Sequence, residues 1–461
     1  MDHLSKLPDD VLCHILSFLA TKEAASTSVL STRWRNLVAY VPNLDLHDYI
    51  FLHDEEGKRE REGVLESFMD FGDRVLVLQG DSTLKKFSLK CLPGVDSDRV
   101  NRWIRNALQR GVSELRLYIE FDIEHRLPAE IFSSKTLVRL KVTNGLNVDL
   151  HVLGVSLPML KTLLLRYVAL FSSQFEMLIC GCPALETLDI KSVEWGNSSV
   201  TVSSASLKTL IIHSRGRRAS ASTLHPSSIS FDTPNLVSFT YTDLAAEDYP
   251  KVNLANVVEA NIDLQLTDDL DERARAPNID GEGDGYLKRF GNVWKLFTGM
   301  KNVRELHLSS DTFEVLYICR ASIPVFNNLK ILSASSSSDR GRQLVPYLLR
   351  NCPSLEDLTY DGLHFKKDKC EDSCNCKSPE DEGRSLISCP VKKLQITEFI
   401  GTYEQFKIIK RFLKDFPCLT EIEIHAREDV LIDVEDSVEI LNSIARCSNS
   451  TASFTLAVSN W

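Results

Sequence analysis

A short apolar phrase of the form L-x-x-L-x-L recurs along most of the chain. Its last two apolar positions are separated by one residue, so they lie on the same face of a short strand while the residue between them faces solvent. Neighbouring copies are mostly about 21 to 29 residues apart, a spacing typical of stacked repeats with one strand each. The copies occupy residues 84–89, 112–117, 137–142, 160–165, 185–190, 207–212, 236–241, 257–262, 303–308, 329–334, 355–360, 391–396 and 419–424.

The segments between the copies have the pattern of turns and helices. Proline stands near the start of several copies, as at Pro158 and Pro183, where it ends the preceding segment. Residues 173–180 and 343–351 read as helices that cover the other side of the strands. We therefore predict an α/β fold, an irregular leucine-rich-repeat solenoid with the shape of a horseshoe, over residues 74–388.

Two features make the predicted repeat irregular. Regular leucine-rich repeats place Asn or Cys shortly after the strand, where the side chain satisfies backbone groups of the turn. Here that position holds Val168, Val193, Leu244 and Leu363. Longer intervals, near residues 265–294 and 361–387, break the period. We expect irregular turns, and we expect both intervals to be surface insertions.

The first 46 residues are helical by pattern. Pro8 suits the start of a helix because it has no N–H to leave unpaired, and Asp9 and Asp10 complement the positive end of the helix dipole. An apolar stripe follows on this helix. A second short helix is expected over residues 24–30, and Ser31 can cap a third. Because three short helices cannot bury this much apolar surface among themselves, we expect a partner to cover some of it.

This segment resembles the F-box. The family pattern is leucine-proline, an acidic pair, an apolar I-L-S-x-L helix, then a serine and R-W-R-x-L. The chain reads L-P-D-D-V-L-C-H-I-L-S-F-L from Leu7 and S-T-R-W-R-N-L from Ser31, followed by V-P-N-L-D-L with the plant-type spacing. The resemblance implies a three-helix F-box domain over residues 1–46 that docks a Skp-type linker protein.

The resemblance assigns linker binding to the apolar residues of these helices, with the later helices completing or supporting the surface. The alternative is that they form only an internal helical core. We expect this of roughly half of the set, since one stripe cannot serve both purposes everywhere. The residues assigned to linker binding are Leu7, Pro8, Val11, Leu12, Ile15, Leu16, Leu19, Val29, Leu30, Trp34 and Leu37.

The segment from Cys389 resembles the FBD domain, which ends many plant-type F-box proteins with leucine-rich repeats. It reads as a strand, a helix and another strand. We therefore expect an FBD domain over residues 389–461 and a linker segment over residues 47–73, between the F-box and the repeats. The apolar residues that share one face of the C-terminal helix are Phe406, Ile409, Leu413 and Phe416.

The composition excludes several classes of protein. The 461 residues carry a formal net charge of −11, whereas phosphate binding needs concentrated Lys and Arg, so a nucleic acid is not expected as the main partner. No run of about 18 apolar residues indicates a membrane span, and residues 1–8 lack the pattern of a signal peptide. We expect a cytosolic or nuclear protein with reduced cysteines, several of them buried thiols within the repeat.

A cluster of cysteines and a histidine in the second insertion could in principle bind zinc, because thiolate and imidazole suit tetrahedral coordination. The spacing matches no standard paired motif, and Cys389 also fits a repeat turn. A plain loop is therefore the expected structure, and no metal is predicted. The cluster contains Cys370, Cys374, Cys376 and Cys389, with His364 nearby.

Two further segments have simple interpretations. Residues 281–285 read G-E-G-D-G without a preceding strand, so they indicate a flexible turn and not a phosphate-binding loop. Arg215, Arg217 and Arg218 could bind an acidic partner or a nuclear-import receptor, but a solvated loop is the better interpretation. No spacing indicates a nucleophile with its base, paired carboxylates or a metal triad, so we expect no catalytic residue and no cofactor.

The F-box resemblance implies the substrate-recognition adaptor of an SCF ubiquitin ligase. In that arrangement the linker protein connects the chain to cullin and RING subunits, and the strand face of the repeats, with the FBD, captures a protein target. The adaptor supplies proximity and no chemistry of its own. The alternatives are a ligase-independent interaction scaffold and a small-ligand receptor. The intact L-P-D-D-V-L helix favours the adaptor.

Overall fold

The computed structural model divides into two compact units, Met1–Arg215 and Gly216–Trp461, which we call unit 1 and unit 2 and describe separately. No helix among the described residues is long and apolar enough to cross a membrane. The structure describes residues 6–48, 61–91, 93–120, 127–144, 154–168, 172–193, 199–214, 227–266, 290–319, 323–335, 345–361, 390–427, 434–447 and 452–458.

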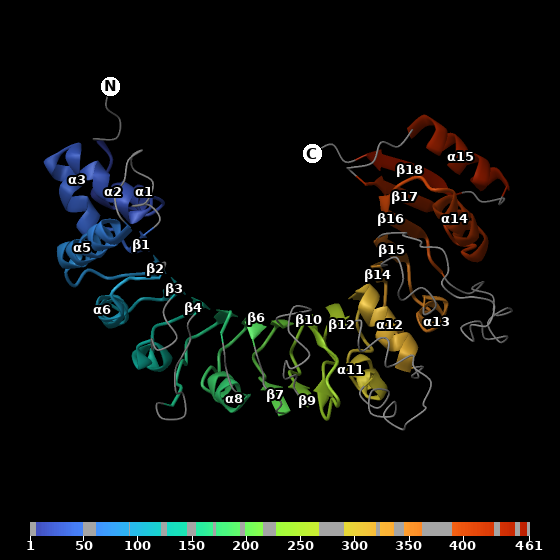
Figure 1. The fold of residues 1–461 in the computed structure, drawn as a ribbon, viewed down its shortest axis with the longest axis horizontal. Helices are drawn as coiled ribbons and strands as arrows, with labels where there is room; N and C mark the ends of the chain where they lie inside the picture. The colour runs from blue at the N-terminus through green and yellow to red at the C-terminus, as the bar shows by residue number, and fades with distance from the viewer. Residues whose placement is uncertain are drawn as a thin grey trace. The chain divides into compact units, whose positions relative to one another are not determined.

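Unit 1 contains seven parallel strands in the order β1-β2-β3-β4-β5-β6-β8. Helices α5, α6 and α8 lie on one side of these strands (Figure 1). The strands are β1 Asn43–His47, β2 Lys86–Cys91, β3 Glu114–Ile119, β4 Arg139–Thr143, β5 Thr162–Arg166, β6 Thr187–Val193 and β8 Thr209–Ser214. A further strand, β7 Ser199–Ser203, lies against α8, where Thr201 N donates to Glu176 Oε1 at 2.8 Å.

The helices of unit 1 fall into two groups. The first group forms the N-terminal helical cluster, and the second connects the strands. The N-terminal elements are α1 Asp9–Leu16, α2 Thr21–Ser26, the 3₁₀ turn η2 Thr27–Val29, α3 Thr32–Leu37 and the 3₁₀ turn η3 Val38–Tyr40. The connecting elements are α5 Arg61–Gln79, α6 Ser97–Gln109, the 3₁₀ turn η4 Ala129–Ser133 and α8 Ser172–Cys180.

Unit 2 contains eight parallel strands in the order β10-β12-β13-β14-β15-β16-β17-β18. They are β10 Ser238–Leu244, β12 Glu259–Gln265, β13 Glu305–Leu308, β14 Ile331–Ser335, β15 Asp357–Asp361, β16 Lys393–Phe399, β17 Glu421–Ala426 and β18 Ser453–Val458. Two shorter strands, β9 Ser228–Asp232 and β11 Val252–Asn253, pair with each other. The helices are α11 Val293–Gly299, α12 Ser310–Cys319, α13 Val345–Arg350, α14 Tyr403–Asp415 and α15 Val434–Cys447.

The recurring phrase marks the strands and the core, as the sequence predicts. Each copy ends within one of the parallel strands, and none of its three apolar residues is more than 6% exposed. The expected helices at 173–180 and 343–351 correspond to α8 and α13. Cys182 and Cys352 are buried thiols at repeat turns, as expected, and burial raises the pKa of Cys182 to about 12. The leucine-rich spacing therefore identifies the strands directly.

The expected irregular turns are also present. Asn144, Tyr167, Ser192 and Glu398 adopt positive φ angles of 63°, 54°, 58° and 56°, a conformation that non-glycine residues seldom take. Each stands two positions after the last apolar residue of a phrase. The turn brings the next residue back toward the apolar core, as the burial of Val168 and Phe399 shows. An apolar side chain thus replaces the turn-satisfying Asn or Cys of a regular repeat.

The α-helix α5 crosses the expected boundary between residues 73 and 74, because it runs without interruption from Arg61 to Gln79. The C-terminal half of the predicted linker segment is therefore helical. Most of both predicted insertions lies outside the described residues, and so do residues 281–285, the arginine cluster at 215–218 and the cysteine cluster with His364. The last residues of the first predicted insertion pack against the protein, since Phe290 is buried and α11 begins at Val293.

Candidate docking surface of the N-terminal helices

The N-terminal helices form where the local signals place them. Helix α1 begins directly after Pro8, and Asp9 and Asp10 occupy its first turn. Helix α3 is capped by Ser31, whose hydroxyl accepts a hydrogen bond from Trp34 N at 3.4 Å. The helices share a small apolar core to which Leu7, Cys13 and Trp34 contribute from its edge. The buried residues of this core are Leu12, Leu16, Ala24, Leu37 and Val41.

The structure divides the predicted linker-binding residues into three groups. Leu12, Leu16 and Leu37 lie inside the helical core, and Leu7 and Trp34 are partly buried against it. The remaining six are exposed to solvent. The buried residues therefore support the surface, and the exposed residues are those that a partner can touch. The exposed residues are Pro8, Val11, Ile15, Leu19, Val29 and Leu30.

Sequence reasoning missed two exposed aromatic residues of this region. Phe18 is 76% exposed in the turn that follows α1, where its ring packs edge-on against His14 with a centroid distance of 4.9 Å. Tyr40 is 66% exposed in η3. Phe18 stands three and seven positions after Ile15 and Val11, so helical spacing could have identified it. We call Val11, Ile15, Phe18 and Leu19 the exposed apolar row of α1.

Arg33 holds the leucine-proline segment against α3. Its Nε and Nη2 donate to Asp9 Oδ1 at 2.8 and 2.6 Å, and Nη2 also donates to the carbonyl oxygen of Leu7. Asp9 is 66% exposed and Arg33 is 37% exposed, so the ion pair itself contributes little stability. Its geometric effect is larger, because it fixes the backbone that presents Pro8 beside the start of α1.

The helical cluster is joined to the first strands by hydrogen bonds. Strand β1 follows η3 and pairs in parallel with β2, from Asn43↔Lys86 to His47↔Lys90. Asn43 Nδ2 donates to the Ser17 carbonyl oxygen at 3.2 Å. The buried Thr21 hydroxyl accepts a hydrogen bond from Asp45 N at 2.7 Å. The helices that present the exposed apolar residues are therefore joined to β1 by hydrogen bonds, and β1 is in turn paired with β2.

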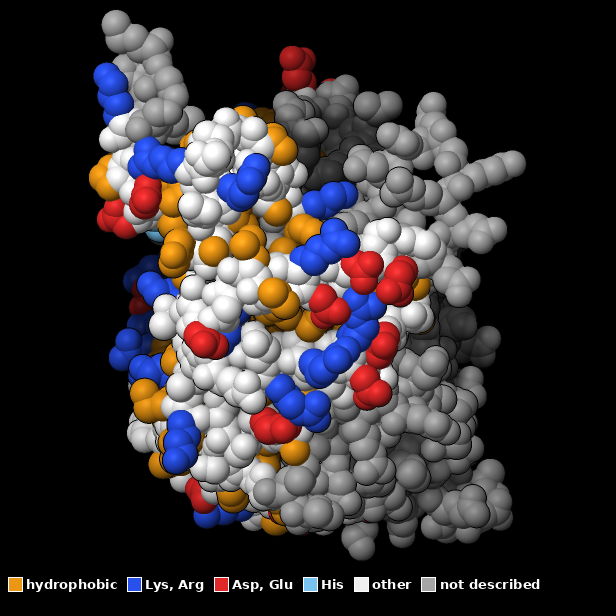
Figure 2. Space-filling view, turned by 90° about the vertical axis from the view of Figure 1, so that its left-hand side faces the viewer, with side chains coloured by type: hydrophobic (Ala, Val, Ile, Leu, Met, Phe, Trp, Pro, Cys, Tyr) orange, Lys and Arg blue, Asp and Glu red, His pale blue; other side chains and the backbone are white. Residues whose placement is uncertain are grey.

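The surface next to these helices has a different character. Figure 2 shows hydrophobic side chains gathered in its upper half, where the N-terminal helices lie, above a band in which positive and negative side chains alternate. At the interface of α5 and α6, Arg99 contacts Glu66, Asp70 and Asp73 at 3.0, 2.9 and 2.7 Å. These charged side chains contact one another, so the exposed apolar side chains of the N-terminal helices are the stronger candidate for protein contact.

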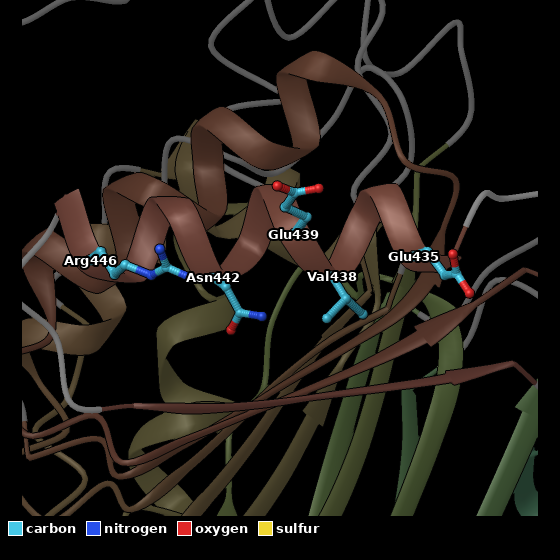
Figure 3. Close-up of a pocket in the computed structure, with 5 residues that line it drawn as sticks. All are labelled: Glu435, Val438, Glu439, Asn442 and Arg446. Carbon is cyan, nitrogen blue, oxygen red and sulfur yellow. The ribbon is translucent and has the colours of Figure 1, made fainter.

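Two other kinds of site find no support in the described part of the chain. No group of three or more His, Cys, Asp or Glu residues there could hold a metal ion. A shallow hollow runs along α15 (Figure 3), and Glu435, Val438, Glu439, Asn442 and Arg446 line it. All five come from one helix, and small-molecule sites need polar groups that converge from several directions. This hollow does not have the features of a receptor pocket.

Comparison with known proteins agrees with this geometry. Residues 4–46 match the F-box domain family, and residues 100–260 match the family "FBD-associated F-box protein At5g56370, LRR repeats". The chain is 52% identical to F-box protein At3g59000 of Arabidopsis thaliana over 93% of its length and 87% of the relative. It is 47% identical to F-box/LRR-repeat protein At3g58930 of the same plant, over 97% of this chain and 96% of the relative.

The chain belongs to the F-box/LRR-repeat family. In this F-box/LRR-repeat protein the matched F-box, residues 4–46, includes α1, α2, α3 and most of β1. The matched repeat segment, residues 100–260, begins within α6 and ends within β12. The exposed apolar row of α1 therefore lies within the F-box, and the strand face of unit 1 lies mostly within the matched repeats.

Proposed function

We propose that this F-box/LRR-repeat protein is the substrate-recognition adaptor of an SCF ubiquitin ligase. The F-box binds a Skp-type linker protein, and through it cullin and RING subunits, while the repeats and the C-terminal region hold a protein target. The main support is the exposed apolar row of α1, which has no structural role inside the helical core and lies within the matched F-box.

The proposed linker-binding surface consists of Pro8, Val11, Ile15, Leu19, Val29 and Leu30, to which we add Phe18. Leu7 and Trp34 hold the edges of this surface, and Leu12, Leu16 and Leu37 support it from inside. Side chains that are already exposed can be buried on binding without unfolding the helices, and each apolar contact then contributes hydrophobic free energy. Arg33 acts as a positioning residue, because it fixes the segment that carries Pro8.

The proposed role requires no catalytic residue in this chain. The adaptor raises the concentration of target lysines near the ubiquitin thioester, and the chemistry belongs to the recruited ubiquitin-carrier enzyme. The corresponding organisation is an F-box at residues 1–46, a leucine-rich-repeat body that extends to residue 388 and includes the whole of α5, and an FBD domain at 389–461. Helix α14 between β16 and β17 supports the last assignment, since its Ile409 and Leu413 are buried as the FBD resemblance implies. We place the protein in the cytosol or nucleus, where its partners would be.

The experiment measures binding of a purified Skp-type linker protein by calorimetry. The test variant is Val11→Ser with Ile15→Ser, which removes two apolar side chains that are 38% and 39% exposed. The control is Val258→Ser with Ile440→Ser, at positions 40% and 42% exposed in unit 2. We expect the test variant to lose affinity by at least about tenfold and the control to bind like the wild type.

Circular dichroism shows whether each variant retains its helices. A folded test variant that binds the linker protein as tightly as the wild type would contradict the proposed surface. A wild-type chain that does not bind any Skp-type linker protein would contradict the adaptor function itself, and would favour a ligase-independent scaffold.

A further inference from the structure

The strand face of unit 1 is basic. Strands β2 to β6 alternate buried residues with residues that point away from the core, and we call these outward positions the unit 1 strand face. Its charged residues comprise many cations and two carboxylates. The cations are Lys86, Lys90, Arg116, Arg139, Lys141, Arg166 and Lys191, and the carboxylates are Glu114 and Asp189.

The strand register brings the cations together at the centre of this face. Arg116 on β3 and Lys141 on β4 are directly paired positions, and Arg166 on β5 is paired with Lys191 on β6. Lys141 and Arg166 stand on adjacent strands, two positions apart in register. Neighbouring strands are about 4.8 Å apart, so these four cations lie on four successive strands across roughly 14 Å.

The two carboxylates neutralise only part of this charge. Glu114 contacts Arg116 at 2.5 Å and Arg139 at 3.7 Å, and Asp189 contacts Arg166 at 3.8 Å. Within the described part of the chain, Lys141 and Lys191 form no ion pair. Burial lowers the pKa of Lys141, and the positive charges of Arg166 and Arg116 lower it further, against the opposing effect of Asp189. The centre of the face therefore holds excess positive charge.

Four side-chain polar atoms of this face also have unused hydrogen-bonding capacity. Thr143 and Arg166 are paired positions on β4 and β5. The Oγ1 atom of Thr143 and the Nε atom of Arg166 are buried and have no hydrogen-bond partner among the described residues, and the same holds for Glu114 Oε1 and Asp189 Oδ1. The Arg166 side chain as a whole is 34% exposed, and a guanidinium offers the planar, two-pronged hydrogen bonding that carboxylates and phosphates accept.

The strand face of unit 2 has the opposite charge, so the basic character is not a general property of these repeats. The outward positions of β12 to β17 include one Lys or Arg residue, Lys393. Gln395 and His425, which hydrogen-bond to each other at 3.0 Å, are typical of its uncharged positions. The acidic residues on these positions are Glu259, Asp263, Glu305, Asp357, Asp361, Glu398, Glu421 and Glu423.

We propose that the unit 1 strand face binds an acidic segment of the target protein, with Arg116, Lys141, Arg166 and Lys191 contacting its carboxylates or phosphates. This inference rests on the proposed adaptor function and names the chemical class of its target. The cations from β2 to β6 span about 19 Å, which corresponds to roughly six residues of an extended peptide. A phosphorylated segment and a glutamate- or aspartate-rich segment share the chemistry that this face recognises.

An acidic peptide fits this face better than a nucleic acid. Single-stranded nucleic acids are held by exposed aromatic residues on which bases stack. The aromatic residue on this face is Tyr118, whose ring is covered by Lys90 with the Nζ atom 5.2 Å from the ring centre. The carboxylates of Glu114 and Asp189 also interrupt the continuous positive track that a phosphate backbone would follow.

The test uses two fluorescein-labelled peptides of eight residues and measures fluorescence anisotropy with the full chain. One peptide is octaglutamate, and the other alternates phosphoserine with glycine. The test variant is Lys141→Gln with Arg166→Gln. The control variant is Arg102→Gln with Arg105→Gln, which removes the same charge from the exposed side of α6.

We expect the wild type to bind at least one peptide, the test variant to bind it at least about tenfold more weakly, and the control to keep its affinity. Preference for one peptide identifies the source of the negative charge. A single variant, Lys141→Gln, provides a second measurement if the double variant does not fold, and its loss of affinity should exceed that of Arg102→Gln alone.

Three outcomes would overturn the proposal. They are a wild type that binds neither peptide, an equal loss in the test and control variants, and tighter binding of a single-stranded oligonucleotide than of both peptides. Linker binding is measured on the same proteins. If the linker binds but the peptides do not, this proposal fails and the adaptor function stands. If the peptides bind but the linker does not, the adaptor function fails instead.

Discussion

Gln79 donates a hydrogen bond from Nε2 to the carbonyl oxygen of Val41 at 3.1 Å, although the two residues are 38 positions apart. The same amide nitrogen also reaches the Val38 carbonyl oxygen at 3.4 Å. Its Oε1 accepts a hydrogen bond from Arg110 Nη2 at 2.9 Å. One buried side chain at the end of α5 therefore connects the last turn of the F-box to the residue that follows α6.

Replacing Gln79 with leucine should destabilise unit 1. The substitution leaves the Val41 carbonyl and one guanidinium donor of Arg110 without their partner in a buried place, and each such loss costs about 1–3 kcal/mol. We expect a lower urea midpoint for the Gln79→Leu variant. The control is Gln109→Leu on α6, where the glutamine is exposed, and its midpoint should remain close to that of the wild type. Equal midpoints for the two variants would show that the amide connection is unimportant.

Arg33→Ala should weaken linker binding more than it weakens the fold. The variant loses a largely solvated ion pair, which costs less than about 1 kcal/mol of unfolding free energy, but it also releases the backbone of Leu7. We expect a severalfold loss of linker affinity in calorimetry with little change in the thermal midpoint. Arg35→Ala, an exposed arginine on the same helix, should change neither. Parallel losses of affinity and stability in Arg33→Ala would indicate a purely structural role.

A methyl group at Gly72 should destabilise the packing of α5 against α6. A Cβ atom built there overlaps the indole ring of Trp103, which is 2% exposed and packs edge-on against Phe68. Overpacking of this kind costs about 1–3 kcal/mol. Gly63 lies on the same helix with open space around its Cβ position, so Gly63→Ala should leave stability unchanged or raise it by about 0.5–1 kcal/mol. Urea unfolding of both variants measures the contrast.

Unit 1 should lose stability in acid partly through Asp73. Partial burial raises the pKa of this carboxyl group, but hydrogen bonds from Trp103 and Arg99 outweigh that effect and hold the pKa below its usual value. A lowered pKa in the folded state contributes stability that is present above the unfolded value, about 3.9, and is lost as the pH falls through the folded pKa. Asp73→Asn should therefore flatten the pH dependence of the unfolding midpoint below about pH 4. The slope should persist in Glu439→Gln, which removes an exposed carboxyl group; persistence in Asp73→Asn would exclude this cause.

The repeat strands could be predicted from sequence because the signal is local. Leu163 and Leu165 are buried in β5 since alternation within a strand fixes which side chains face the core. The apolar stripe of α1 does not by itself show which of its residues are buried. Val11 and Leu12 are adjacent and both apolar, but only Leu12 is buried. Which side of a wide stripe faces inward depends on where α3 packs, and that information lies more than twenty residues away in the chain.

The connection between the F-box and the repeats could not be predicted. The segment 43–47 carries an apolar alternation, but its pairing with β2 joins residues separated by 43 positions, as at Asn43↔Lys86. The boundary expected between residues 73 and 74 falls inside α5. The N-terminal part of this helix, which includes Glu66 and Asp70, has the composition of a solvated segment, so the sequence does not indicate that it belongs to the helix. Pairing with Arg99 explains why these acidic residues lie on an ordered helix.

The β1–β2 pairing also determines how an adaptor of this kind would hold its target protein relative to the linker protein. A flexible tether would let the bound target swing, so that any lysine within its radius could be modified. Here the F-box continues into the sheet through the consecutive backbone pairing of β1 with β2, from Asn43↔Lys86 to His47↔Lys90. A target held on the unit 1 strand face would keep one orientation toward the linker protein. The lysines that are modified would then be determined by their position on the target and not by the length of a flexible tether.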